Sequence, residues 1–135
     1  MSIEDKYQSL ISYFKEPARR KTFQAWPFKN NEKCNANKMA EAGFIFSGSS
    51  RDPDSAQCFF CHKHLDGWES TDDPWDEHLN HSKECSFAKM KNAQSHWTAA
   101  EWFELYSQYR RNLIERKYDE QRKKVKELFD KIRSE

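Results

Sequence analysis

The chain has 135 residues, a net charge of +1, a hydrophobic fraction of 36% and a mean hydropathy of −1.13. This length fits one domain, or a small domain with an appendage, and so few apolar residues exclude a self-sufficient core along the whole chain. No stretch approaches the ~18 consecutive apolar residues of a transmembrane helix, and the first residues lack the apolar segment of a signal peptide. We therefore expect an intracellular protein, in which four cysteines indicate metal binding before disulfides.

The first third of the chain predicts two helices. Apolar residues recur at helical spacing over residues 3–14, and Pro17 limits the continuation of that helix. A second helix is expected over residues 36–42, with Asn35 as its N-cap and Gly43 as its C-terminal stop.

The middle third predicts strands and a further helix. Residues 44–60 have the pattern of a strand, a turn and a second strand, and residues 65–69 fit a third short strand. A helix is expected over residues 74–82, starting at a proline and capped by Asp72 or Asp73. These elements make a small mixed module of helices and strands with local connections.

The last third predicts one long helix. Thr98 and Glu101 have the spacing of a capping box, and no proline or glycine follows to the C-terminus. Such a helix would be roughly 55 Å long, and a small module is too short to cover its apolar stripe. The stripe steps along Trp102, Tyr106, Tyr109 and Leu113, and after a one-residue slip along Ile114, Tyr118, Gln121, Val125, Leu128 and Ile132.

We predict that this stripe packs against partner helices, because a solvated helix laced with charge pairs explains the charges but not the apolar positions. Direct contact of the basic positions with nucleic acid is a second interpretation, which ranks behind the first. The predicted partner-helix residues are Trp102, Tyr106, Tyr109, Leu113, Tyr118, Val125, Leu128 and Ile132.

A metal site is indicated by Cys58 and Cys61, whose spacing lets two thiolates meet one tetrahedral ion. Cys85 is the remaining downstream cysteine, so a histidine has to complete the set. The two histidines nearest Cys61 lie too close to it, which leaves His78 and His81 in competition. Three thiolates and one imidazole form a closed structural zinc set without a position for a catalytic water. The alternative is that the cysteines are small buried hydrophobic residues, which is also the interpretation favoured for Cys34, as a partly buried free thiol.

Six carboxylates crowd around Trp68 and Trp75: Asp66, Glu69, Asp72, Asp73, Asp76 and Glu77. A solvated acidic face is one interpretation. A site for a cation beside apolar walls, such as a peptide α-amino group with a small first side chain against Trp68, is the other. General acid–base catalysis is disfavoured because the metal set is closed and no nucleotide-binding or hydrolase motif occurs, so we expect no enzyme.

The motifs over residues 15–90 resemble the baculoviral inhibitor-of-apoptosis repeat (BIR) family, whose zinc spacing Cys-x2-Cys-x16-His-x6-Cys selects His78 over His81. The motifs are Arg19-x2-Thr-Phe-x2-Trp-Pro, Met39-Ala-x-Ala-Gly-Phe44, Cys58-Phe-x-Cys61, Gly67-Trp68-Glu69, Asp73-Pro74, Glu77-His78 and Cys85-x-Phe87.

The resemblance implies an α+β fold in four parts. A helical segment over residues 1–14 precedes a zinc-binding BIR module over 15–90, which contains a short three-stranded antiparallel sheet with surrounding helices. A linker over 91–97 leads into the long helix over 98–135. The implied cofactor is one structural Zn²⁺ held by Cys58, Cys61, His78 and Cys85.

For a member with one BIR module and a long C-terminal helix, the resemblance implies a non-enzymatic subunit of the chromosomal passenger complex. Its helix would bundle with helices of borealin and the inner centromere protein, which localises Aurora B kinase indirectly in chromosome segregation and cytokinesis. The implied locations are the nucleus, the centromere and spindle midzone in mitosis, and the cytoplasm otherwise. Homodimers are a further implication, with Trp97, Trp102 and Phe103 in place of the family's leucine-rich segment.

The BIR surface would bind a histone tail that begins Ala-Arg-Thr, with the threonine phosphorylated. The implied roles are Asp72 and Glu77 for the α-amino group, Leu65 and Trp68 for the alanine pocket, Asp66 for the first peptide residues, Asp52 for the arginine, and Lys63 and His81 for the phosphate. The alternative function is an inhibitor of apoptosis that binds caspases or their antagonists with N-terminal alanine.

Overall fold

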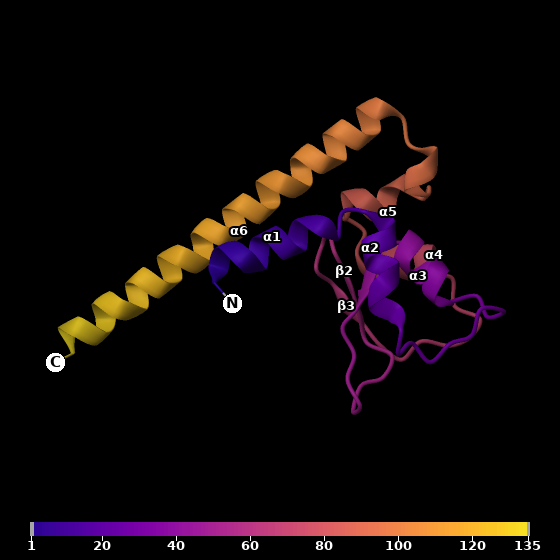
Figure 1. Ribbon diagram of the computed structural model, residues 1–135, viewed down its shortest axis with the longest axis horizontal. Helices are drawn as coiled ribbons and strands as arrows, with labels where there is room; N and C mark the ends of the chain where they lie inside the picture. The colour runs from indigo at the N-terminus through magenta and orange to yellow at the C-terminus, as the bar shows by residue number, and fades with distance from the viewer. Residues whose placement is uncertain (1, 135) are drawn as a thin grey trace.

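Residues 2–134 are described by a computed structural model, so residues 1 and 135 of the predicted first and last segments lie outside the described part. A small module of helices and strands is joined to one long helix that projects away from it (Figure 1). None of the described helices is long and apolar enough to cross a bilayer. The elements are α1 (Ile3–Ser12), α2 (Glu16–Arg20), η1 (Lys21–Phe23), α3 (Ala36–Glu41), β1 (Phe44–Phe46), β2 (Ala56–Cys58), β3 (His64–Leu65), α4 (Pro74–His81), α5 (Ser86–Met90), η2 (Gln94–His96) and α6 (Ala99–Arg133).

The three strands form one antiparallel sheet in the order β1-β2-β3, which confirms the predicted fold class. Phe44 pairs with Cys58, so the register of β1 and β2 sets the position of the first metal-binding cysteine. The third strand is shorter than the predicted 65–69 and begins one residue earlier. It ends early because Gly67 takes a φ of +70° and the backbone N–H of Trp68 donates to the Asp54 carboxylate instead of a strand partner.

The helix starts follow the predicted caps. The Asn35 side chain accepts a hydrogen bond from the Lys38 N–H at 2.9 Å, and the Asp73 carboxylate accepts from the first turn of α4. Gly43 follows α3 with a φ of +97°, where a Cβ would lie 2.7 Å from the ring of Phe87. The sequence did not predict α2, α5 or η2, which are too short to show a hydrophobic period.

An aromatic cluster around Phe14 joins the module to the long helix. The ring of Phe14 lies between 5.0 and 6.2 Å, centroid to centroid, from five other rings, most of them edge-on. Those rings belong to Phe59, Trp97, Trp102, Tyr106 and Tyr109. Large aromatic side chains therefore supply the core that the low apolar content leaves short.

Arg19 is fully buried beneath this cluster. Its guanidinium donates hydrogen bonds of 2.9–3.0 Å to the carbonyl oxygens of Tyr13, Phe14 and Ala40 and to Oε1 of Gln94. Burial lowers the pKa of Arg19 to about 10, which leaves it charged at neutral pH. One side chain thus ties together the end of α1, the end of α3 and the linker before α6.

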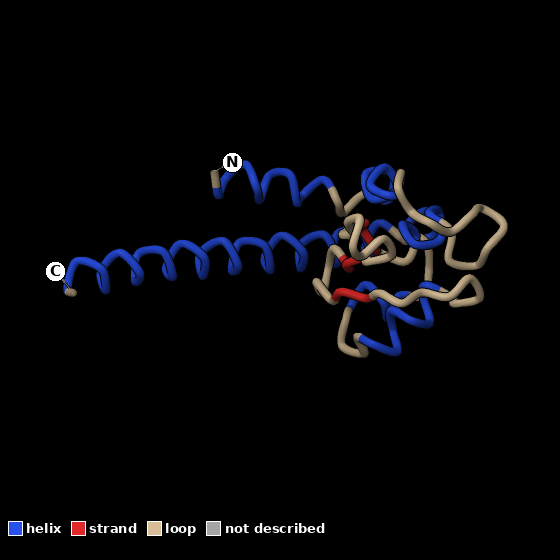
Figure 2. Tube along the Cα trace, turned by 90° about the horizontal axis from the view of Figure 1, so that it is seen from below, coloured by secondary structure: helices blue, strands red, loops and turns tan. Residues whose placement is uncertain are grey.

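The long helix α6 begins with the predicted capping box, in which the Glu101 N–H donates to Oγ1 of Thr98 and the Thr98 N–H donates to the Glu101 carboxylate. Its first part packs on the module and on α1, which lies antiparallel alongside it (Figures 1 and 2). The Tyr109 hydroxyl donates to the Leu10 carbonyl at 2.6 Å, and the Tyr7 hydroxyl donates to Glu120 at 3.0 Å.

This packing corrects part of the predicted partner seam. Tyr109 and Leu113 are buried within the chain, and Trp102 and Tyr106 pack partly buried against its core. Tyr109 and Leu113 are unavailable to partner helices because α1 and the module already cover them, whereas the role of the half-buried Trp102 and Tyr106 stays a prediction. The other four predicted residues, Tyr118, Val125, Leu128 and Ile132, are exposed.

Candidate functional site

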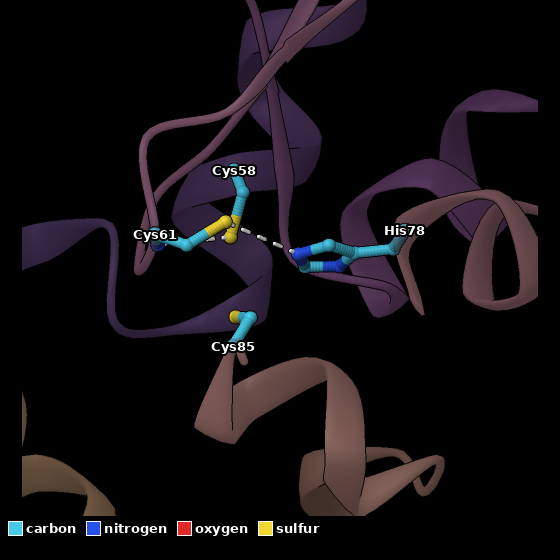
Figure 3. Close-up of side chains that lie close together, drawn as sticks. All are labelled: Cys58, Cys61, His78 and Cys85. Carbon is cyan, nitrogen blue, oxygen red and sulfur yellow. Dashed lines mark hydrogen bonds between the residues drawn. The ribbon is translucent and has the colours of Figure 1, made fainter. Parts of the chain in front are cut away.

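Four side chains with metal-binding atoms converge between β2, α4 and α5, as Figure 3 shows. Their ligand atoms all lie within 4.8 Å of one another. Cys58 ends β2, and the turn after it brings Cys61 back toward the same point, with the N–H groups of Phe60 and Cys61 donating to Cys58 Sγ at 3.2 and 3.3 Å. His78 comes from α4 and Cys85 from the N-cap of α5.

The imidazole of His78 is oriented by the backbone. Its Nδ1 lies 2.7 Å from the carbonyl oxygen of Ala42, so Nδ1 donates a hydrogen bond to that oxygen and Nε2 is the ring atom that faces the sulfurs and would bind a metal. Nε2 lies 3.6 Å from Cys61 Sγ. Tetrahedral Zn–S and Zn–N bonds of usual length predict a separation of about 3.6 Å. The three thiols and one imidazole therefore fit a tetrahedral metal ion.

The pKa shifts of the cysteine and histidine side chains also indicate that this group can bind a cation. Hydrogen bonds with Cys58 and Cys85 hold the pKa of Cys61 far below its usual range, and the Ser82 hydroxyl donates to the same sulfur at 3.1 Å. Burial raises the pKa of Cys58. Burial alone would lower the pKa of His78, but its hydrogen bonds to Cys61 and Cys85 outweigh it and raise the value to about 9. A bound cation would replace these shared protons, because coordinating thiols are deprotonated.

The remaining cysteine and the rival histidine lie outside the group. Cys34 is completely buried, which corrects the expectation of partial burial, and its thiol donates to the Glu69 carbonyl at 3.2 Å. Burial raises the pKa of this thiol to about 11, so it is unreactive at neutral pH. His81 is exposed, and its Nε2 lies 3.4 Å from the Glu77 carboxylate.

A cleft of about 360 Å³ lies between β3 and α4, and His81 is among the residues that line it. Seven of the eight residues predicted to bind a peptide line it. These are Lys63, Leu65, Asp66, Trp68, Asp72, Glu77 and His81. Asp52 is not among the lining residues and lies on the exposed turn between β1 and β2, so its role stays a prediction.

The walls of the cleft are held in place by short contacts. Trp68 is buried against Phe44, with ring centroids 5.4 Å apart, and its Nε1 donates to the Leu65 carbonyl at 3.3 Å. One oxygen of the Asp72 carboxylate accepts the Glu69 N–H at 2.8 Å. The cleft therefore combines a fixed apolar wall with three carboxylates, those of Asp66, Asp72 and Glu77.

Sequence reasoning missed three residues of this region. His64 and Gly67 line the cleft, and Asp54 holds the backbone of Trp68 from the neighbouring turn at 2.9 Å. A glycine before a tryptophan at the end of a strand is a signal for the positive φ that Gly67 adopts. Asp54 carries no such signal, because its contact joins residues 14 apart in the sequence.

Residues 19–89, more than half of the chain, match the family described as "Inhibitor of Apoptosis domain", BIR. The chain belongs to the BIR family. The Cys₃His group falls inside the matched residues, as does the whole of the cleft.

The two relatives compared with this chain carry the same name in two organisms. Baculoviral IAP repeat-containing protein 5 of Cavia porcellus is 40% identical over 90% of this chain and 84% of its own length. Its counterpart in Mus musculus is 41% identical over 78% of this chain and 76% of its own length. This relative is survivin, so the matches confirm the predicted resemblance to family members with one BIR module and a long C-terminal helix. Such survivin-type members are in general non-enzymatic adaptors.

Among solved structures, the crystal structure of DIAP1 BIR1 bound to a Grim peptide aligns with a TM-score of 0.48 and 31% identity. The alignment covers 56% of this chain and 71% of that chain.

Proposed function

We propose that the chain is a non-enzymatic adaptor with two binding sites, one on the BIR module and one on the exposed half of α6. The module reads the amino terminus of a histone tail that begins Ala-Arg-phosphoThr. The helix bundles with borealin and the inner centromere protein, and the assembly thereby localises Aurora B kinase in chromosome segregation and cytokinesis. The relatives named above support this role, because the proposal is the one that survivin-type members imply.

The metal in this proposal is one structural Zn²⁺ held by Cys58, Cys61, His78 and Cys85. The donor set, the 3.6 Å edge between Cys61 and His78 and the hydrogen bond from His78 to Ala42 all support it. The ion would tie β2, α4 and α5 together and leave no coordination position for a substrate. Its contribution is rigidity in a chain whose apolar content is low.

The observation that carries the histone proposal is the composition of the cleft. A free α-amino group requires carboxylates beside an apolar wall, which Asp72, Glu77 and Trp68 provide. Lys63 and His81 line the same cleft, where Lys63 supplies positive charge and the His81 ring an N–H donor for a phosphate further along the peptide. A cleft that served only the amine would have no need of the two basic residues.

The test is a titration of the full chain with Ala-Arg-Thr peptides in three forms. We expect the phosphothreonine peptide to bind most tightly, the unphosphorylated peptide to bind more weakly, and the N-acetylated phosphopeptide to lose binding. A Lys63→Ala variant should lose most of the gain from phosphate, whereas Lys83→Ala, a control lysine outside the cleft, should retain it. No gain from phosphate, or no loss on acetylation, would refute histone reading.

The helix proposal rests on the exposed residues of α6. Tyr118, Val125, Leu128 and Ile132 are each more than half exposed and lie on one side of a helix that projects from the module (Figure 1). Apolar residues at this spacing are typical of a helical bundle. Such a bundle would recruit the chain to the centromere and spindle midzone in mitosis, and the chain would otherwise be nuclear and cytoplasmic. A fluorescent fusion of the full chain, compared with its Leu128→Asp variant, tests this localisation.

A second function is favoured by the family description itself, "Inhibitor of Apoptosis domain". The same cleft would accept the N-terminal alanine of a caspase antagonist, since that ligand also presents a free amine and a small first side chain. The phosphate arm of the titration separates the two functions, because an antagonist peptide carries no phosphate for Lys63 and His81.

A further inference from the structure

Five of the seven large apolar residues that are exposed on the described part of the chain follow a heptad alternation on α6, whereas Phe103 and Phe129 lie off it. Ile114, Tyr118, Val125, Leu128 and Ile132 are between 47% and 60% exposed, and Gln121 fills the one gap among them. Their steps are four, three, four, three and four residues, which places all six positions on one side of the helix. We call this set the exposed seam.

One flank of the exposed seam carries only lysine. Lys117, Lys124 and Lys131 each precede a seam residue by one position and lie seven residues apart, so they form a single row along the helix. We call them the lysine row. The opposite flank, where a residue follows a seam position, is mixed and carries Glu115, Arg122 and Phe129.

Among residues 2–134, only the first member of the lysine row forms an ion pair. Lys117 pairs with Glu4 of α1, which lies beside this part of α6. Lys124 and Lys131 are exposed, and among the described residues neither has an ion-pair partner. The row therefore presents two positive charges without a contacting carboxylate among the described residues, directly beside an apolar surface, and the nearby Glu120 offsets part of the charge of Lys124.

This charge pattern selects between occupants of the exposed seam. A second copy in antiparallel alignment would place one lysine row against the other, which is repulsive. In parallel alignment the row would face the mixed flank, where only Glu115 is acidic. A helix with its own apolar seam and carboxylates every seventh residue along its flank would instead neutralise the row. Acidic residues away from the seam, Asp119, Glu120, Glu127 and Asp130, weaken the attraction for a nucleic-acid backbone.

We infer that the exposed seam takes a helix with an acidic flank, and that the lysine row selects this partner against self-association and against basic helices. The inference rests on the proposed function, since it names the chemistry of the helices that the adaptor gathers. The row adds specificity and rate of association more than affinity, because its charges lie at the edge of the buried surface.

The test uses the full chain and two synthetic four-heptad helices with identical Ile/Leu seams, both N-acetylated so that they cannot offer an amine to the cleft. One carries Glu and the other Lys at every flanking position. Fluorescence anisotropy at about 0.05 and 0.5 M salt should show that the acidic helix binds roughly tenfold more tightly at low salt, with the difference shrinking at high salt.

Matched variants identify the lysines responsible. Lys124→Glu/Lys131→Glu should reverse the preference between the two helices. Lys123→Glu/Lys126→Glu makes the same change in net charge away from the seam and should preserve it. Equal affinity for both helices, equal behaviour of the two variants, or tighter binding of a 20-base-pair DNA duplex than of the acidic helix would overturn the inference.

Assembly with borealin and inner-centromere-protein helices, measured in parallel, separates this inference from the proposed function. Normal assembly combined with no effect of Lys124→Glu/Lys131→Glu would refute the charge selection and leave the adaptor intact. Preference for the acidic helix without assembly would support the charge selection and refute the proposed partners.

Discussion

At the scale of single residues, two histidines on one helix show how the backbone assigns chemistry. His78 and His81 are three positions apart on α4, and spacing in the sequence leaves both able to complete the metal set. The carbonyl of Ala42 decides between them, because it accepts the proton of His78 Nδ1 and turns Nε2 toward the sulfurs. No local sequence pattern contains that contact, which joins residues 36 apart. The choice of His78 as the ligand could therefore be predicted only from the zinc spacing of the family.

The first prediction concerns these two histidines. His78→Ala should lose bound zinc and the cooperative unfolding transition of the module, because a three-thiol site cannot close a tetrahedral shell. His81→Ala should keep zinc and unfold within about 0.5 kcal/mol of the parent, since its side chain is exposed. Zinc content by mass spectrometry and thermal unfolding by circular dichroism check both, and full zinc in His78→Ala would contradict the ligand assignment.

The second prediction concerns the amine site. Asp72→Asn removes the negative charge but retains an oxygen that can accept the Glu69 N–H, so the loop should remain folded. Affinity for a free-amine peptide should fall by about tenfold or more, as for loss of one charged partner. Asp76→Asn is the control, since Asp76 is exposed on the first turn of α4, four residues after Asp72, but does not line the cleft. Equal losses in both variants would point to a general effect of charge.

At the scale of elements, the one-residue slip in the apolar stripe of α6 marks a change of partner. Before the slip, Tyr109 and Leu113 are buried against α1 and the module. After it, Ile114 is half exposed at the edge of the groove beside α1, and Tyr118 is more than half exposed. The periodicity predicted the helix and the slip, but it could not show that α1 covers the first part. That covering depends on contacts such as the one between Tyr109 and the carbonyl of Leu10, 99 residues apart.

The third prediction separates the two parts of the stripe. Tyr109→Ala should cost about 3–5 kcal/mol of unfolding free energy, because a fully buried ring is removed from the aromatic cluster. Leu128→Asp should leave stability unchanged, because Leu128 is exposed, and should abolish association with partner helices. Chemical denaturation and size-exclusion chromatography with partner peptides check the pair. Destabilisation by Leu128→Asp in the free chain would contradict this division.

At the scale of the whole molecule, the metal group and the aromatic cluster together stabilise a chain whose apolar content is low. The ligands come from β2, α4 and α5, while Phe14 and Arg19 connect α1, the module and α6. The sheet, the capped helices and the three cysteine ligands could be predicted because local patterns encode them, whereas the choice of His78 as the fourth ligand needed the family spacing. The short helices and the docking of α1 on α6 could not, because they depend on long-range packing.

The fourth prediction is that a chelator unfolds the module. Removing zinc leaves three thiols and an imidazole without their common centre, so the near-ultraviolet signal of the aromatic cluster should be lost and the midpoint of thermal unfolding should fall. Lowering the pH should release the metal as well, because protons compete for the thiolates. Cys34→Ser should retain one zinc per chain, since Cys34 lies outside the group. An unchanged melting profile in chelator would contradict a structural role.

The central claim is that one chain serves two ligands at once, and Figure 1 shows α6 carrying its exposed half away from the module. The most direct measurement is calorimetric titration of Ala-Arg-phosphoThr peptide into the free chain and into its preformed complex with borealin and inner-centromere-protein helices. We predict one peptide per chain and dissociation constants that agree within about twofold, because separated sites do not compete. Displacement of the helices by the peptide, or loss of peptide binding in the complex, would contradict the account.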